Sequence, residues 1–371
     1  MVPNHGFTAR ILEILTEEFG DLGPQLLEQS SLLQYLNNKT KSANRGSKSR
    51  GSFGNLYAIY VLVEDYCNNG FLEREDYAEY EGARFSDLFR RQRELPFGAK
   101  LQNHALNQRL NLEFGKYFPT VETPPIIRDQ GAQRYWVNEH LLSVQVGDGT
   151  VNVAPAILRI VDAYVEARTG AFEEFIADCE RLRGLALNDP EAVVDFIHSL
   201  LRPNVDARIF EVVSYAILQP YYEREAVYLG WTADDVSRET LTLYKTGRTN
   251  ANDGGIDFVL QPLGRFFQVT ETVDVSKYFL DIEKIHRYPI TFVIKSEEGV
   301  EELRARLEAA AKRRFPVDRI VARYMDAVEE LINIPELQAR VEVLRQAGLL
   351  HAVMDQLVRH SKLEFGFYDG D

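Results

Sequence analysis

The stretch "NDGGIDFVLQPLGRFFQVTET", residues 252 to 272, constrains the fold more than any other part of the chain. Its β-branched and aromatic residues predict two short strands joined by a tight turn. A helical pattern over residues 205 to 223 precedes this hairpin, a second over 274 to 286 follows it, and an apolar strand over 288 to 296 comes next. The order helix, strand, strand, helix, strand predicts a small mixed sheet flanked by helices.

Polar residues occur within these apolar strands. Because strand side chains alternate between faces, Gln268 and Thr270 share one face of the second strand, and Asp257 lies on the first. Glu211 lies on the upstream helix. Carboxylate and amide oxygens suit Mg²⁺, and a hard cation assists phosphodiester hydrolysis by stabilising negative charge and activating water. Taken singly, each residue also fits a turn cap or a solvent-facing polar position.

This arrangement resembles the core motif of the PD-(D/E)XK nuclease superfamily, and among its members the type II restriction endonucleases. The likeness covers about residues 205 to 296. It implies Mg²⁺ as the cofactor, with Asp257, Gln268 and Glu211 as metal ligands, and Asp257 and Gln268 in the catalytic motif.

The sequence departs from the family pattern at Thr270, which stands where the family has a lysine that positions or activates the attacking water. Lys277, one turn into the following helix, or Lys245, upstream, is expected to supply that ammonium group. Thr270 and Lys277 therefore complete the expected catalytic set.

The net charge of −14 argues at first against a polyanionic partner. Residues 1 to 135 hold 16 Lys+Arg and 17 Asp+Glu, a net of −1, so the remaining 26 and 39 leave the later part at −13. A basic surface can therefore exist in the first third of the chain.

Two N-terminal segments are candidates for contacts with DNA. The first is the segment of residues 37 to 55, "NNKTKSANRGSKSRGSFGN", which combines cations with Ser, Asn and Gly between two apolar segments. The same composition is also typical of a solvated loop. A helix over 100 to 115 presents further amide and basic side chains, of which a lone histidine is more often structural. The candidate residues are Lys39, Lys41, Asn44, Arg45, Lys48, Arg50, Lys100, Asn103, His104 and Asn107.

The expected fold class is α/β (α+β), with three domains. Residues 1–150 form a mainly helical, winged-helix-like DNA-recognition domain, residues 151–300 a mixed-sheet PD-(D/E)XK nuclease core, and residues 301–371 a helical C-terminal extension without strands. Helices are also expected over 7 to 36 and 56 to 66, and an irregular connector over 121 to 130.

The function expected is Mg²⁺-dependent, sequence-specific cleavage of double-stranded DNA by a homodimer. The alternatives are a DNA-binding protein on a nuclease scaffold that has lost cleavage, and an acidic helical interaction protein. Two cysteines, no apolar run of membrane-spanning length and no signal-like N-terminus indicate a soluble cytoplasmic protein without a membrane partner.

Overall fold

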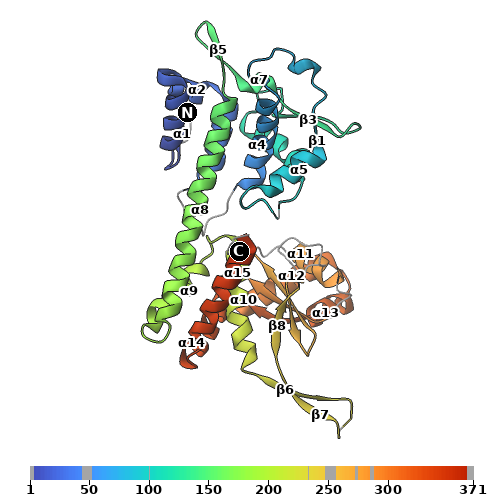
Figure 1. The fold of residues 1–371 in the computed structure, drawn as a ribbon. Helices are drawn as coiled ribbons and strands as arrows, with labels where there is room; N and C mark the ends of the chain where they lie inside the picture. Colours follow the sequence, from blue (N-terminus) through green and yellow to red (C-terminus); the bar gives the residue numbers. More distant parts are fainter. Residues whose placement is uncertain are drawn as a thin grey trace. The chain divides into compact units, whose positions relative to one another are not determined.

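A computed structural model describes residues 4–43, 52–99, 101–232, 234–246, 256–271, 275–284 and 288–365. The chain divides into two units, Met1–Glu174 and Phe175–Asp371 (Figure 1). Helix α8 (Ala154–Leu185) begins in the first unit and ends in the second. Within the described residues, no helix is both long and apolar enough to cross a membrane.

Helices build most of the first unit. The segment expected to be helical over 7 to 36 is confirmed as three α-helices with a short 3₁₀ turn between the first two. Ser30 separates the last two, because its hydroxyl accepts a hydrogen bond from the Leu33 N–H and caps the new helix. The α-helices that precede α8 are α1 (Thr8–Phe19), α2 (Gly23–Gln29), α3 (Ser31–Thr40), α4 (Phe53–Asn68), α5 (Phe85–Glu94), α6 (Leu110–Tyr117) and α7 (Glu139–Leu142).

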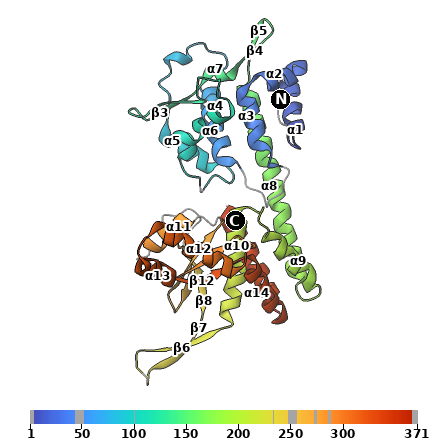
Figure 2. The same ribbon diagram turned by 180° about the vertical axis from the view of Figure 1, so that it is seen from behind.

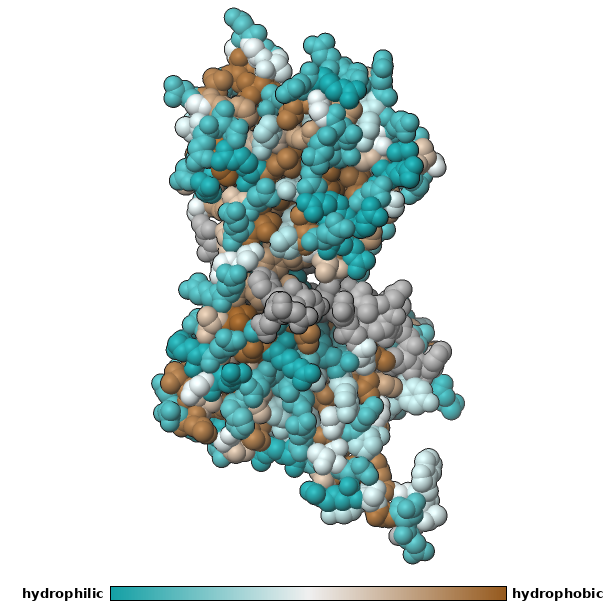
Figure 3. All heavy atoms as spheres, viewed as in Figure 1, coloured by the Kyte–Doolittle hydropathy of each residue, from teal (hydrophilic) through white to brown (hydrophobic). Residues whose placement is uncertain are grey.

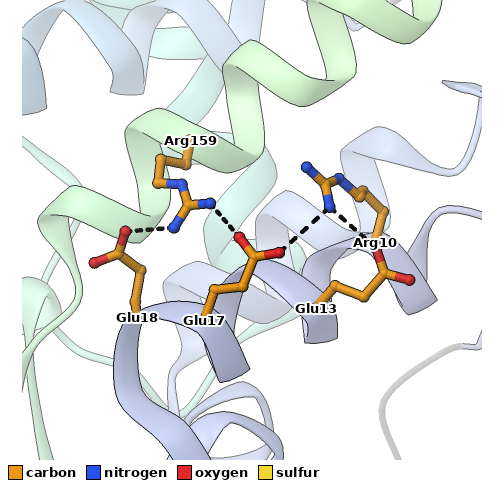
Figure 4. Close-up of polar contacts among 5 residues, drawn as sticks. All are labelled: Arg10, Glu13, Glu17, Glu18 and Arg159. Carbon is orange, nitrogen blue, oxygen red and sulfur yellow. Dashed lines mark hydrogen bonds and ion pairs between the residues drawn. The ribbon is translucent and has the colours of Figure 1, made fainter.

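The core of the first unit forms around α4, which is buried over most of its circumference, as its apolar sequence predicts. At the surface, exposed ion pairs link α1 to α8 (Figure 4). Arg159 of α8 contacts Glu17 and Glu18, and Glu17 also lies 3.8 Å from Arg10. Such exposed pairs contribute little stability individually, so the buried core dominates this unit.

Small strands interrupt the helices of the first unit. One antiparallel sheet has the order β1-β3-β2, and β4 pairs with β5 as a hairpin. The expected connector over 121 to 130 therefore contains a strand, which the prolines in front of it concealed. The bounds are β1 (Ala83–Arg84), β2 (Ile126–Asp129), β3 (Arg134–Val137), β4 (Ser143–Val146) and β5 (Gly149–Asn152).

A five-stranded mixed sheet, in the order β12-β11-β10-β9-β8, forms the centre of the second unit. Strands β8, β9 and β10 pair antiparallel, whereas β10, β11 and β12 pair parallel. The expected hairpin and mixed sheet are thus confirmed. The bounds are β8 (Thr242–Lys245), β9 (Phe258–Gln261), β10 (Arg265–Thr270), β11 (Ile290–Ile294) and β12 (Val328–Ile332).

Helices cover both faces of this sheet (Figures 1 and 2). On one face α10 packs against β8 and against α14 and α15. On the other, α11, α12 and α13 form an apolar cluster with β11 and β12. The helices of this unit, besides the end of α8, are α9 (Pro190–Leu200), α10 (Ala207–Glu223), α11 (Val275–Lys284), α12 (Val300–Arg314), α13 (Asp318–Ala327), α14 (Ile334–Gln346) and α15 (Leu350–Phe365).

The segment from residue 301 onward differs from the strand-free extension expected for it. Strand β12 pairs with β11 and joins the central sheet. Its sequence, "VEELI", hides this role because Glu329 and Glu330 interrupt the apolar pattern. Both acids pair with Arg265 of β10, so the neighbouring strand supplies the compensating charge.

A second hairpin was also not expected. Strands β6 (Ala226–Gly230) and β7 (Val236–Thr240) follow α10 and precede β8 in the chain. They form a separate two-stranded antiparallel sheet.

Candidate active site and nucleic-acid interface

Asp257 lies immediately before β9, and hydrogen bonds to the backbone of neighbouring strands hold it. Its N–H donates to the Phe267 carbonyl (2.8 Å), and its own carbonyl accepts from the Thr246 N–H (3.0 Å). Its carboxylate Oδ2 accepts a hydrogen bond of 2.6 Å from the Val269 N–H. The carboxylate is therefore fixed against the backbone of β10.

The side chains of β10 alternate between two different environments. The ring of Phe267 contacts Tyr222 of α10 at 5.8 Å between ring centroids. Phe266 packs on the opposite side, against the apolar cluster formed with α11, α12 and α13. We call these sides the α10 face and the α11 face. By alternation, Val269 lies on the α10 face with Phe267, and Gln268 lies on the α11 face with Phe266.

Gln268 and Thr270 share a face, as their spacing predicts, but it is the α11 face. They lie opposite Phe292 and Ile294 of β11 and are only 8% and 5% exposed. The Gln268 amide nitrogen donates to the Val269 carbonyl (3.2 Å), while the amide oxygen has no hydrogen-bond partner among the described residues. Both side chains are therefore buried, beside the apolar cluster that β11 forms with α11, α12 and α13.

Glu211 lies elsewhere, on the α10 face, where its carboxylate is 2.8 Å from the ammonium group of Lys245. Both side chains are nearly buried. The structure therefore brings Lys245, one expected source of the missing ammonium, to Glu211 rather than to Gln268 and Thr270. It does not bring Glu211 and Gln268 to the same face of the sheet.

A further acid–lysine pair on the α10 face was missed at the level of the sequence. Lys295 directly follows β11, and its side chain is only 3% exposed. Its ammonium group donates to the Val205 carbonyl, lies 3.1 Å from the Glu271 carboxylate, and is 5.9 Å from the centre of the Phe210 ring. Its N–H also donates to the Thr270 carbonyl (2.9 Å), which ties the end of β11 to the end of β10.

One signal could have identified this pair. In the strand "ITFVIK" a lysine follows five consecutive residues without charge, and Glu271 is the first acid after β10. Since parallel strands end at the same edge of a sheet, a lysine and an acid at these two ends are expected to be neighbours.

A histidine lies close to the α10 face. His360 of α15 contacts the ring of Tyr215 at 4.5 Å between centroids. Burial, together with the nearby charges of Lys245 and Arg359, lowers the pKa of His360 to about 4. The imidazole is therefore neutral at neutral pH.

The donor set for a cation is small. Within the described residues, no group of three or more His, Cys, Asp or Glu side chains is arranged to hold a metal ion. Mg²⁺ usually takes only one or two carboxylates, with water and substrate oxygens completing the shell. Lys277 lies on α11, but its side chain is outside the described part of the chain.

Lys39 and Lys41 of the proposed DNA-contacting loop lie in different environments. The ammonium group of Lys39 is 2.6 Å from the Glu113 carboxylate, which also accepts from the amide of Asn55. Lys41 is exposed. The remaining loop residues, Asn44, Arg45, Lys48 and Arg50, are outside the described residues, as is Lys100.

On the second candidate segment, His104 is exposed and Asn103 is half-buried. Asn107 is also half-buried, and its side-chain oxygen accepts a hydrogen bond from the Tyr135 hydroxyl (3.0 Å). Asn107 therefore helps to hold β3 against the preceding helix.

No protein-family model matches the chain, and neither a curated protein nor a solved structure matches it.

Proposed function

We propose that the protein is a Mg²⁺-dependent endonuclease that hydrolyses phosphodiester bonds in double-stranded DNA, similar in kind to the type II restriction endonucleases. Support comes from the order of elements in the second unit: α10, three antiparallel strands, the crossover helix α11 and the parallel strand β11. This order extends the helix, strand, strand, helix, strand pattern that carries the resemblance. Asp257 lies at the start of the middle antiparallel strand, where the family has its first acid.

The observation that carries the proposal is the pair formed by the buried Lys295 and the exposed Glu271 at the ends of β11 and β10. Thr270 stands where the nuclease family has its lysine. Lys295 supplies an ammonium group at the same edge of the sheet. In the proposed site Asp257 and Glu271 provide carboxylates, and Lys295 orients the attacking water and offsets developing negative charge. Gln268 and Thr270 then support the strand rather than take part in the reaction.

Mg²⁺ in such a site stabilises the charge of the transition state and lowers the pKa of its bound water. Asp257 is the first ligand candidate because its carboxylate is fixed at the strand end, and Glu271 is the second. Glu211 forms an ion pair with Lys245, so in the proposed site it would position Lys245 rather than bind the metal ion itself.

The proposal is tested with purified protein, a mixed-sequence plasmid and Mg²⁺, with Asp257→Asn as the site variant. We expect discrete fragments from the unchanged protein and none from the variant, which should still bind DNA. Glu308→Gln is the control, because Glu308 is an exposed acid on α12. Equal cleavage by Asp257→Asn would contradict the site, and retarded but intact DNA with the unchanged protein would favour the non-cleaving DNA-binding protein. No effect on DNA would favour the acidic interaction protein.

The DNA surface can be tested separately through its salt dependence. Each lysine that neutralises a phosphate adds about 0.9 to the slope of log K against log[salt]. We expect Lys41→Ala to reduce the slope by about one contact and Lys39→Ala to change it little, because Lys39 is already paired with Glu113. Equal reductions would mean that Lys39 exchanges Glu113 for a phosphate.

A further inference from the structure

The corner between α12 and α13 in the second unit is strongly basic. Residues 312 to 323 hold five Lys+Arg and one Asp, a net of +4. The second unit as a whole holds 24 Lys+Arg and 33 Asp+Glu, a net of −9, so positive charge is concentrated at this corner. Hydrophilic residues cover much of the visible surface of this unit (Figure 3). It is therefore the sign of the charge that distinguishes the corner from its surroundings.

Four of the five cations have no acidic partner within the part of the chain that the structure describes, and all four are exposed. Lys312 differs, because its ammonium group lies 2.6 Å from the Glu308 carboxylate. We call the other four residues the arginine corner. They are Arg313 and Arg314 at the end of α12, and Arg319 and Arg323 on α13.

Aromatic rings hold the arginine corner on a fixed frame. Phe315, which follows α12 directly, stacks on Tyr324 of α13 with 4.7 Å between ring centroids and 10° between ring planes. Phe279 of α11 contacts both rings edge to face. Arg314 lies over the Phe315 ring at 5.6 Å. Groups that are already held in place lose less freedom on binding, so this frame favours affinity for a ligand.

A nucleic acid fits the arginine corner better than a membrane surface does. A helix that lies on a membrane turns its apolar face to the lipid. The apolar face of α13, with Val321 and Tyr324, is instead buried in the core of the second unit. The aliphatic residues exposed at the corner, Val317 and Ile320, are small for a membrane anchor. Arginine suits a phosphate backbone, because its planar guanidinium group can donate two hydrogen bonds to one phosphate.

The arginine corner lies away from the proposed reacting edge of the sheet. Lys295 follows the end of β11, whereas α13 leads directly into β12, and Val328 of β12 pairs with Ile290 at the start of β11. Arg313 is about 20 Å along α12 from Val300, where that helix begins after β11. The four arginines are therefore separate from the groups assigned to the reaction.

We propose that the arginine corner is a DNA-binding surface of the second unit, which holds the phosphate backbone of double-stranded DNA without reading its sequence. The identity of the polyanion rests on the proposed function, whereas the position of the surface does not. Phosphate contacts carry no sequence information directly, and contacts of this kind let a protein slide along DNA. The corner would therefore help the enzyme to reach its cleavage site on a long molecule.

Fluorescence anisotropy of a short labelled duplex tests the proposal at several salt concentrations, in EDTA so that no cleavage occurs. The variant Arg313→Gln, Arg319→Gln, Arg323→Gln leaves Arg314 on the Phe315 ring. We expect the slope of log K against log[salt] to become shallower by about 2 to 3, because each phosphate contact contributes about 0.9. Affinity should fall by the same factor for duplexes of different sequence.

Two further variants serve as controls. Arg181→Gln, Arg183→Gln, Arg224→Gln removes the same charge from exposed arginines outside the corner and should leave the slope nearly unchanged. Replacing the three arginines at 313, 319 and 323 by lysine keeps the charge and should keep the slope. An equal slope in the glutamine variant and the matched control overturns the inference.

Failure of this inference can be distinguished from failure of the proposed function. Cleavage by the unchanged protein in Mg²⁺, together with equal slopes in the glutamine variant and its control, overturns this inference alone. Binding of the duplex through the arginines without cleavage supports this inference and overturns the cleavage. Binding of phosphatidylserine vesicles in place of the duplex identifies a membrane surface, and it overturns both.

Discussion

The two faces of the central sheet hold their polar side chains in different ways. On the α10 face, Lys245 and Lys295 are nearly buried, and each is paired with a glutamate. On the α11 face, Gln268 and Thr270 are uncharged and buried beside an apolar cluster, and Asp281 of the covering helix α11 is buried as well. A buried charge is tolerated when it has a partner, so the paired lysines of the α10 face are suited to hold reactive positions. The face of the sheet on which a strand residue lies, more than its spacing in a motif, therefore decides whether it is a candidate for a catalytic role.

Substituting Lys295 should have the largest effect. We expect Lys295→Met to lower the rate of DNA cleavage by roughly 10²–10³, because an electrostatic stabiliser is removed from the reacting end of the sheet. Plasmid cleavage measured under single-turnover conditions checks this, with DNA affinity measured in parallel. Lys312→Met, at an exposed lysine of α12, is the control. Cleavage by Lys295→Met at the unchanged rate would mean that the α10 face is not the reacting face.

Placing a lysine on the other face should cost stability. We expect Thr270→Lys to lower the free energy of unfolding by roughly 2–4 kcal/mol, because a longer side chain with an ammonium group would enter a buried position opposite Ile294. Urea unfolding measures the loss, and Val317→Lys at an exposed position should show little change. A stable Thr270→Lys variant with faster cleavage would reverse the comparison and return the catalytic role to position 270.

The sequence predicted the parts of this unit that depend on local patterns. The hairpin around residues 257 to 270, the helix α11 and the strand β11 all follow from periodicity and turn residues. Strand β12 did not, because its two acids are compensated by Arg265, which lies 65 residues from Glu330 in the chain, and by Arg340 on the following helix. Tertiary pairing of this kind leaves no local signal.

The candidate site was predictable to a similar extent. Asp257 was expected on the first strand of the hairpin and lies immediately before it, and alternation correctly put Gln268 and Thr270 on one face. Nothing local could show which helix covers that face, because the choice depends on how the crossover through α11 folds onto the sheet. The pair of Lys295 and Glu271 needs the parallel pairing of β10 with β11, which joins residues separated by a helix.

The pH dependence of folding stability tests the environment of His360, which lies close to the α10 face. Its pKa in the folded chain, about 4, is below the unfolded value of about 6.5, so the unfolded chain binds more protons between these values. Stability from the neutral imidazole is complete above pH 6.5 and is lost as the pH falls toward 4. Because the side chain is partly exposed, we expect a loss of roughly 1–2 kcal/mol.

Urea unfolding at several pH values measures this loss, and His360→Gln is the matched variant. The variant should show a shallower fall in stability over the same range, while the contribution of His198, whose pKa is also lowered by burial, stays the same in both proteins. Equal pH dependence in the two proteins would mean that burial and the nearby charges of Lys245 and Arg359 do not disfavour a charged imidazole at this position.

The smallest effect is expected at Gln268. Its substitution tests whether Gln268 binds the metal ion or only supports the strand. Methionine is close to glutamine in shape and removes a buried amide oxygen that has no hydrogen-bond partner among the described residues. We therefore expect Gln268→Met to raise the free energy of unfolding by up to about 1 kcal/mol and to leave cleavage unchanged. Gln92→Met is a matched control in the first unit, because Gln92 is also buried with an amide oxygen that lacks a partner within the described residues. If Gln268→Met abolishes cleavage while Gln92→Met does not, the Gln268 oxygen holds the metal ion, and the α11 face must open to admit it.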